Sequence, residues 1–294
     1  MSRVATLVDA ALRNAWSFSD LPWQLDVDPT REGFAEQSFF ADGLRPFRAM
    51  ALGQRRAFVF RETCFHLSNL LAGERSGEHL VAQVLVSTAR ERPEDREFLA
   101  LMAQEEAKHY LALQRYLSEK AGVIYPPCAR LRAVLGAVEE CASPEVKLLV
   151  GQIVLEWTAA SLISTLLLKS REPLLKAILR VNLKDEARHL AYSHELREPL
   201  ARIFEKRVPS EMEDLVFESV RASVAALLAE PVWAELGLEG RRMRRHGLER
   251  LERLGVLARY REVVPQQLER CGFPIARLKR RLGQGLVKGL IDDA

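Results

Sequence analysis

Two short motifs of the same kind lie 80 residues apart, at residues 105–109 (EEAKH) and 185–189 (DEARH). Each reads acid, Glu, Ala, base, His. On a helix, a glutamate and a histidine three positions apart project from the same face. Carboxylates and neutral imidazoles together are ligands that suit divalent transition metals. The two motifs therefore predict two halves of one metal site.

A single carboxylate interrupts the most apolar stretch of the chain. Between Leu148 and Leu168 the only ionisable side chain is Glu156. An unpaired carboxylate in an apolar interior costs several kcal/mol, so Glu156 should be protonated, paired or bound to a metal. About 15 residues separate Glu156 from the break at residues 169–173, and about 13 separate that break from Glu186. Two antiparallel helices with a rise of ~1.5 Å per residue would therefore bring Glu156 level with Glu186 and His189.

The equivalent glutamate before the first motif is either Glu74 or Glu78. They precede Glu106 by 32 and 28 residues, whereas Glu156 precedes Glu186 by 30 residues. The lengths of the two arms on either side of the intervening turn slightly favour Glu78. Spacing alone leaves both open.

The remaining sequence predicts helices. Apolar residues recur every three or four positions from Pro46 onwards, and no alternating strand pattern of useful length is present, so the class is all-α. We predict an N-terminal extension over residues 1–46, a helical bundle over 47–205, and a C-terminal helical extension over 206–294 that packs on the bundle.

Composition narrows the functional classes. With 294 residues and 48% apolar content the chain can bury a large core, and a net charge of +3 is too small to imply nucleic acid. The four cysteines are far apart, which argues for a reducing compartment and against disulfides or a thiolate zinc site. Residues 1–16 lack a signal-peptide core, and Gln152 and Glu156 interrupt the one segment long enough to span a bilayer. A cytoplasmic, soluble protein that binds neither membrane nor nucleic acid is predicted.

Two further segments carry a resemblance. Residues 70–74 (LLAGE) resemble the Gly-Glu segment of soluble di-iron monooxygenase hydroxylase subunits, and residues 156–160 (EWTAA) resemble their Glu-Trp-Ala-Ala segment. Both acid-Glu-Ala-base-His motifs fit the same superfamily, which includes the p-aminobenzoate N-oxygenases. The resemblance covers roughly residues 60–195 and implies a ferritin-like four-helix bundle. It implies two iron ions, or manganese in the purified protein, held by Glu74, Glu106, His109, Glu156, Glu186 and His189.

The resemblance also assigns the neighbouring acids and the chemistry. It favours Glu74 over Glu78, and it implies that Glu105 and Asp185 orient the histidines from outside the metal. The implied function is an O2-activating oxidase or oxygenase that hydroxylates, N-oxygenates or desaturates a small organic or carrier-bound substrate. The p-aminobenzoate N-oxygenases have an extra histidine ligand where this chain has Asn182, which weakens the case for N-oxygenation.

Other functions stay open at this stage. An iron-oxidising or storage protein and a metal-free helical scaffold are the alternatives, and the long extensions at both ends favour a covered pocket over storage. No nicotinamide- or flavin-binding motif is present, so electrons should come from an external ferredoxin or reductase, or from the substrate. A homodimer is also open. His66 and His79 lie near the motifs in sequence, and we interpret them as packing histidines.

The C-terminal tail is basic. Four arginines fall within about one and a half helical turns, and leucines spaced by three predict one helix that lies on the bundle: Arg241, Arg242, Arg244 and Arg245, with Leu248, Leu251, Leu254 and Leu257. The charged face is either ordinary solvated surface or a docking site for an acidic partner, such as a carrier protein or a ferredoxin.

Overall fold

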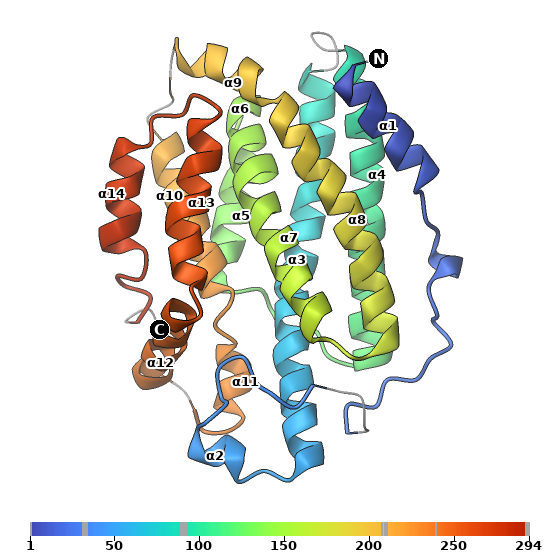
Figure 1. Ribbon diagram of the computed structural model, residues 1–294, viewed down its shortest axis with the longest axis vertical. Coiled ribbons are helices and arrows are strands. Elements are labelled where there is room, and N and C mark those ends of the chain that lie inside the picture. The colour runs from blue at the N-terminus through green and yellow to red at the C-terminus, as the bar shows by residue number, and fades with distance from the viewer. Residues whose placement is uncertain are drawn as a thin grey trace.

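The computed structural model describes residues 2–30, 35–88, 93–206, 208, 211–238 and 240–291. These residues form helices and connecting segments with no strand among them, so the predicted all-α class is confirmed (Figure 1). In chain order the elements are α1 (Arg3–Arg13), the 3-10 helix η1 (Phe18–Asp20), α2 (Arg45–Arg48), α3 (Leu52–Thr88), α4 (Pro93–Arg115), the π-helix η2 (Tyr116–Ala121), α5 (Ala129–Glu140), α6 (Pro144–Val146), the π-helix η3 (Lys147–Leu155), α7 (Glu156–Lys169), α8 (Pro173–Glu195), α9 (Arg197–Phe204), α10 (Met212–Ala225), α11 (Glu230–Ala234), α12 (Gly240–Arg253), α13 (Val256–Glu269) and α14 (Ala276–Gly285).

Four long helical segments form the centre of the molecule. They are α3, α4, the continuous run α6–η3–α7, and α8, which lie side by side in Figure 1. Helix α3 packs along α4, α7 packs along α8, and α4 also contacts α8. Helices α10, α12, α13 and α14 lie on one side of these segments and α1 on the other. The division into residues 1–46, 47–205 and 206–294 stays a prediction.

Local sequence signals account for where helices α6 and α8 begin. Ser143 caps α6 by accepting a hydrogen bond from the Val146 backbone N–H, and Pro144 occupies the first turn. The Glu172 carboxylate accepts the N–H groups of Leu174 and Leu175 at the start of α8, which again has a proline in its first turn. The chain between α7 and α8 is therefore short and the two helices run antiparallel, as predicted.

A nine-residue π-helix, η3, leads directly into Glu156. Its backbone hydrogen bonds join residues five positions apart, one more than in an α-helix. Such segments are rare, and those that occur often lie at functional sites. The side-chain amide of Gln152, within η3, donates to the backbone carbonyl of His189 on α8 at 3.1 Å. This bond ties the wide turn to the helix that carries the second motif.

Segments that precede and follow the four central helical segments meet at a buried carboxylate on helix α3. Glu62 is fully buried and accepts hydrogen bonds from the Ser38 hydroxyl at 2.8 Å, the Phe39 backbone N–H at 3.2 Å and the Trp233 indole N–H at 3.3 Å. Phe40 packs edge-on against Trp233 with ring centroids 5.1 Å apart. The N-terminal extension is thus held between α3 and the C-terminal helices.

The predicted single helix in the basic tail is wrong. It is divided into α12 and α13 at Gly255, whose φ of 71° lies in the left-handed region that glycine adopts readily. Leu248, Leu251 and Leu257 are buried, but Leu254 lies at the break and is 56% exposed.

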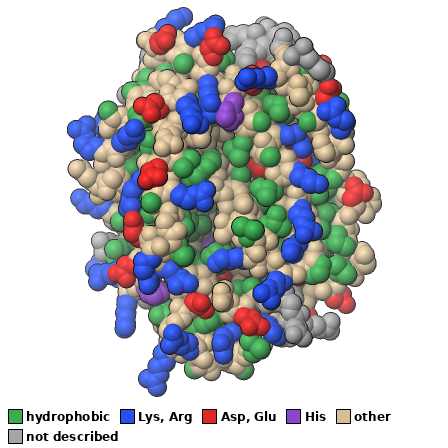
Figure 2. All heavy atoms as spheres, in the orientation of Figure 1, with side chains coloured by type: hydrophobic (Ala, Val, Ile, Leu, Met, Phe, Trp, Pro, Cys, Tyr) green, Lys and Arg blue, Asp and Glu red, His purple; other side chains and the backbone are tan. Residues whose placement is uncertain are grey.

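The predicted basic surface does not include all four arginines. Arg244 is buried and its guanidinium lies 3.3 Å from the Glu230 carboxylate, so it contributes little to the surface. Figure 2 shows that Lys and Arg side chains are spread over the face in view and are not gathered at one place.

The segment Pro144–Lys169 is long and apolar enough to cross a membrane by length and composition. Half of its apolar window, 50%, is buried inside the protein. A single helix of this kind is weak evidence for a membrane span, because the core helix of a soluble protein has the same properties.

Candidate metal centre

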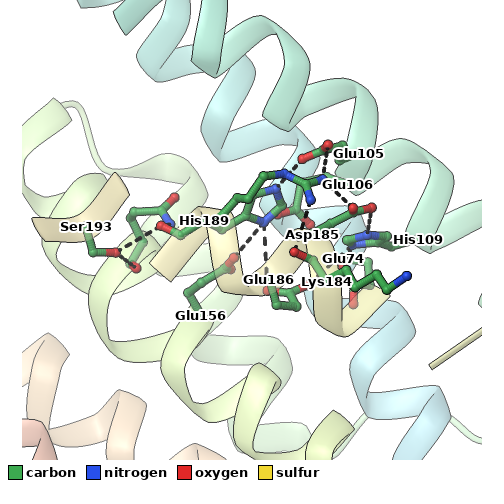
Figure 3. Close-up of polar contacts among 12 residues, drawn as sticks. Glu74, Glu105, Glu106, His109, Glu156, Lys184, Asp185, Glu186, His189 and Ser193 are labelled. Carbon is green, nitrogen blue, oxygen red and sulfur yellow. Dashed lines mark hydrogen bonds and ion pairs between the residues drawn. The ribbon is translucent and has the colours of Figure 1, made fainter. Parts of the chain in front are cut away.

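The structure brings six of the predicted side chains together in two groups of three (Figure 3). One group is Glu74 from α3, His109 from α4 and Glu186 from α8; the other is Glu106 from α4, Glu156 from α7 and His189 from α8. Within each group one ligand-type atom from every residue lies within 4.8 Å of the others. The two histidine rings are 6.0 Å apart between centroids, so the groups are neighbours.

The Nδ1 atom of each histidine faces carboxylates. His109 Nδ1 lies 3.3 Å from Glu74 Oε2 and 3.4 Å from Glu186 Oε1. His189 Nδ1 lies 2.8 Å from Glu156 Oε1 and 3.2 Å from Glu106 Oε1. Each cluster therefore offers one imidazole nitrogen and two carboxylates around a common point, which is a donor set for a divalent metal.

Glu186, a member of the first group, also faces the histidine of the second group. Its Oε1 atom is 3.4 Å from His109 Nδ1, and its Oε2 atom is 3.8 Å from His189 Nδ1. A carboxylate whose two oxygens face different clusters is placed to bridge two cations. Glu156 also lies beside His189, as the helix lengths predicted.

The outer nitrogen of each histidine is held by an acid from the opposite motif. Asp185 Oδ2 lies 3.0 Å from His109 Nε2, and Glu105 Oε2 lies 3.0 Å from His189 Nε2. An Nε2–H bond to a carboxylate leaves the Nδ1 lone pair free to bind a metal. Both acids were expected to orient the histidines, but their crosswise assignment between α4 and α8 was not expected.

Two further residues, not anticipated from the sequence, support these outer acids. The Arg188 guanidinium contacts Glu105 at 2.5 Å and also contacts Asp185. The indole N–H of Trp16, in the N-terminal extension, donates to Asp185 at 2.8 Å. Arg188 therefore pairs with the outer acids. The base in the second motif was the only sequence signal for this role.

Burial and mutual repulsion control ionisation in the cluster. Burial raises the pKa of Glu74 and of Glu156 well above the usual range, and the charges of Glu106 and Glu186 add to the effect. Burial also raises the pKa of Glu186, but hydrogen bonds from His109 and His189 outweigh it and hold that pKa low. Without a cation, protons must balance the carboxylates.

Both histidines take up part of that balance. Burial opposes the charged form of each ring. For each ring the surrounding acids together outweigh burial, so both pKa values lie well above the usual one. The largest of these contributions comes from Glu74 for His109 and from Glu105 for His189. Two divalent cations would neutralise four carboxylates and make these protons unnecessary.

Orphaned oxygens provide an independent test of whether a metal fits. Three buried carboxylate oxygens have no hydrogen-bond donor of acceptable geometry in the part of the chain that the structure describes: Glu74 Oε1, Glu106 Oε1 and Glu186 Oε2. A buried carboxylate oxygen without a donor is costly, and a bound cation removes that cost. The residues present therefore fit a pair of divalent metal ions.

Three other residues considered from the sequence, Glu78, Asn182 and His79, lie outside the two groups. Glu78, one turn beyond Glu74 on α3, is half-buried and belongs to neither group, so the geometry favours Glu74. Asn182 lies one turn before Glu186 on α8 and is fully buried, and among the described residues neither of its side-chain polar atoms has a hydrogen-bond partner. His79 is exposed and lies away from the groups, 3.9 Å from Glu139.

A cavity adjoins the carboxylates. This inner cavity of about 70 Å³ is lined by Glu74, Glu106, Glu156 and Glu186 at one end and otherwise mainly by apolar side chains, among them Leu80, Val81, Leu99 and Met102. Small molecules that reach this space would lie directly beside the acids and away from bulk water.

Comparison with protein-family models and with curated protein sequences found no match for this chain.

Proposed function

We propose that the chain is an O2-activating di-iron oxidase or oxygenase with a ferritin-like four-helix bundle formed by α3, α4, α6–η3–α7 and α8. The observation that carries the proposal is the pair of neighbouring Glu-His-Glu groups, with Glu186 of the first group facing the histidines of both. The proposed ligands are Glu74, His109 and Glu186 at one iron and Glu106, Glu156, His189 and Glu186 at the other. Manganese would suit the same donors.

When bound, the metal pair supplies reducing electrons and open positions at which O2 is activated. The chain has three tasks around it. Asp185 and Glu105 hold the Nε2 protons of the histidines, which keeps each Nδ1 lone pair turned inward. The apolar wall of the inner cavity excludes water from the reacting centre. Glu156, next to the π-helix, stands at the boundary between the acids and the cavity.

The apolar cavity favours an organic substrate over iron storage, because an iron entry path would carry acidic or polar groups along its wall. Oxidation of a small organic or carrier-bound molecule therefore completes the proposal. An external ferredoxin or reductase would provide electrons, and the setting would be the cytoplasm.

Metal analysis with a matched pair of variants tests the proposal. The full chain, expressed with iron, should contain about two iron ions per molecule and consume O2 after reduction. Glu74→Ala should lose metal and O2 uptake, whereas Glu78→Ala, one turn along the same helix, should retain both. A single zinc ion, no metal, or normal loading of Glu74→Ala would contradict the assignment.

A further inference from the structure

Three cavities adjoin in a row that begins at the metal centre. The inner cavity shares Leu70, Gly73, Leu135, Leu155 and Ala159 with a middle cavity of about 70 Å³. The middle cavity shares Thr158, Leu162, Leu227 and Tyr260 with an outer cavity of about 310 Å³. Each cavity therefore borders the next along the residues they share.

The junction nearest the metal centre is open on one side. A methyl group added at Gly73 would meet no atom within 4 Å, and Ala159 on the facing helix is also small. The middle and inner cavities therefore meet where two residues of the wall are small.

The outer cavity combines an apolar wall with unused polar groups. Phe40, Trp157, Leu227 and Leu251 contribute apolar surface, and its volume falls in the range of small-molecule sites. The Tyr260 side chain borders the same cavity. Among the described residues no hydrogen bond of acceptable geometry reaches either ring nitrogen of His66, which is 1% exposed, although the Ala226 carbonyl is near enough to affect its pKa. Groups of this kind are expected where a ligand supplies the missing hydrogen bonds.

The charges around the outer cavity have one sign. Its ionisable lining comprises Lys169 from α7, Arg259 from α13, the buried His66 and Tyr260; among the described residues no Asp or Glu lines it. Neither Lys169 nor Arg259 has a carboxylate within ion-pair distance in the described ranges, and Lys169 Nζ instead lies 3.4 Å from the ring centroid of Phe39. Burial, together with the charge of Arg250, lowers the pKa of Lys169, while Glu62 and Asp42 oppose this at longer range. Lys169 and Arg259 are both exposed at this cavity, and an anion bound there would provide a partner for each.

His66 is suited to a neutral role in this setting. Burial lowers its pKa to about 4, against a smaller opposing effect of the Ala226 carbonyl. The neutral ring offers one donor and one acceptor. It can therefore hydrogen-bond a ligand without adding a charge.

Helix α7 gives the length of the route. Thr158, Ser161, Leu162, Thr165 and Lys169 all line the outer cavity, so one face of α7 runs along it towards Glu156. Lys169 and Glu156 are 13 residues apart, or ~20 Å along the helix. Because bonds zigzag, an extended chain advances ~1.2 Å per bond, so roughly sixteen bonds would cover that distance and a fourteen-carbon chain would cover most of it.

We propose that the outer cavity binds the carboxylate of a long-chain monocarboxylic acid between Lys169 and Arg259, with its hydrocarbon chain directed through the middle cavity towards the metal centre. The binding site stands on the cavity and its charges alone. The statement that this acid is the substrate rests on the proposed function.

Calorimetric titration of the full chain with tetradecanoate tests the site, in both metal-free and iron-loaded protein. Tetradecan-1-ol provides the uncharged comparison and acetate the comparison without a chain. The double variant Lys169→Gln/Arg259→Gln should bind tetradecanoate about tenfold more weakly or worse and tetradecan-1-ol unchanged. The matched control is Arg253→Gln/Arg280→Gln, which removes the same charge from exposed positions outside the cavity and should bind as the wild type does.

A steric variant provides a second measurement. Ser161→Trp places a large ring in the outer cavity and should abolish binding of both the acid and the alcohol. If that variant does not fold, as judged by circular dichroism, the charge variants still decide.

Three outcomes would overturn the proposed site. They are equal tetradecanoate affinity in the two charge variants, equal affinity for acid and alcohol in the wild type, and no saturable tetradecanoate binding. Iron content is measured on the same samples. Absence of iron with intact tetradecanoate binding would remove the proposed function and leave the site standing, whereas two irons without binding would do the opposite.

Discussion

A methyl group at Gly77 tests the metal centre from one helix turn away. Built onto the helix, the Cβ of alanine would lie 2.9 Å from Glu106 Oε2 and 3.2 Å from its Cδ, where ordinary contacts begin at 3.4 Å. The Glu106 carboxylate would have to move by several tenths of an ångström. At Gly73, one turn earlier on α3, the same methyl would meet nothing within 4 Å.

The two substitutions share one effect and differ in another. Replacing a helix-interior glycine with alanine stabilises the helix by up to about 1 kcal/mol at either position. Without a metal, the Glu106 side chain can rotate away from the new methyl. Metal–ligand distances tolerate only about 0.2 Å of error, so a displaced Glu106 should lower metal affinity by about 10- to 100-fold.

Iron titration followed by urea unfolding separates these effects. Gly73→Ala should bind iron as tightly as the wild type and unfold at higher urea in its metal-free form. Gly77→Ala should match it in stability without metal but lose most of the stabilisation that iron provides. Wild-type iron affinity in Gly77→Ala would refute the placement of Glu106 at the metal.

Three further outcomes are expected. Asp185→Asn should weaken iron binding by about 10- to 100-fold, because the amide no longer holds His109 Nε2–H as a charged acceptor does, and metal titration checks this. Removing the metal with a chelator should lower the thermal midpoint; if free iron exceeds Kd by about 1,000-fold, the loss is about 4 kcal/mol, measured by calorimetry. Burial raises the pKa of Glu62 from 4.5 to about 7 against its bonds to Ser38 and Trp233, so the folded state binds this proton more tightly than the unfolded state does. Stability should therefore fall by about 3 kcal/mol as pH rises from 4.5 through 7, and urea titrations at both ends of that window should show the loss in wild type and not in Glu62→Gln.

The sequence was informative wherever the signal was local. Three-residue spacing within each motif places Glu106 with His109 and Glu186 with His189 on one helix face, whatever the helix packs against. The counts on both sides of the break at residues 169–173 were enough to bring Glu156 beside His189, at 2.8 Å. Helical periodicity likewise sufficed for the all-α class. Each of these follows from the constant rise and rotation of an α-helix.

Tertiary structure decided what depends on which helices touch. Spacing left Glu74 and Glu78 open because both face the same way on α3, and the packing of α3 against α4 selects Glu74. The crosswise bonds of Glu105 and Asp185 join motifs on different helices, so no spacing within one motif could assign them. The row of cavities and the pairing of Arg244 with Glu230 likewise depend on contacts between segments that are far apart in the sequence or lie on different helices. Periodicity determines which face of a helix is apolar, whereas side-chain packing across distant segments determines where that face leaves a space and which charge it covers.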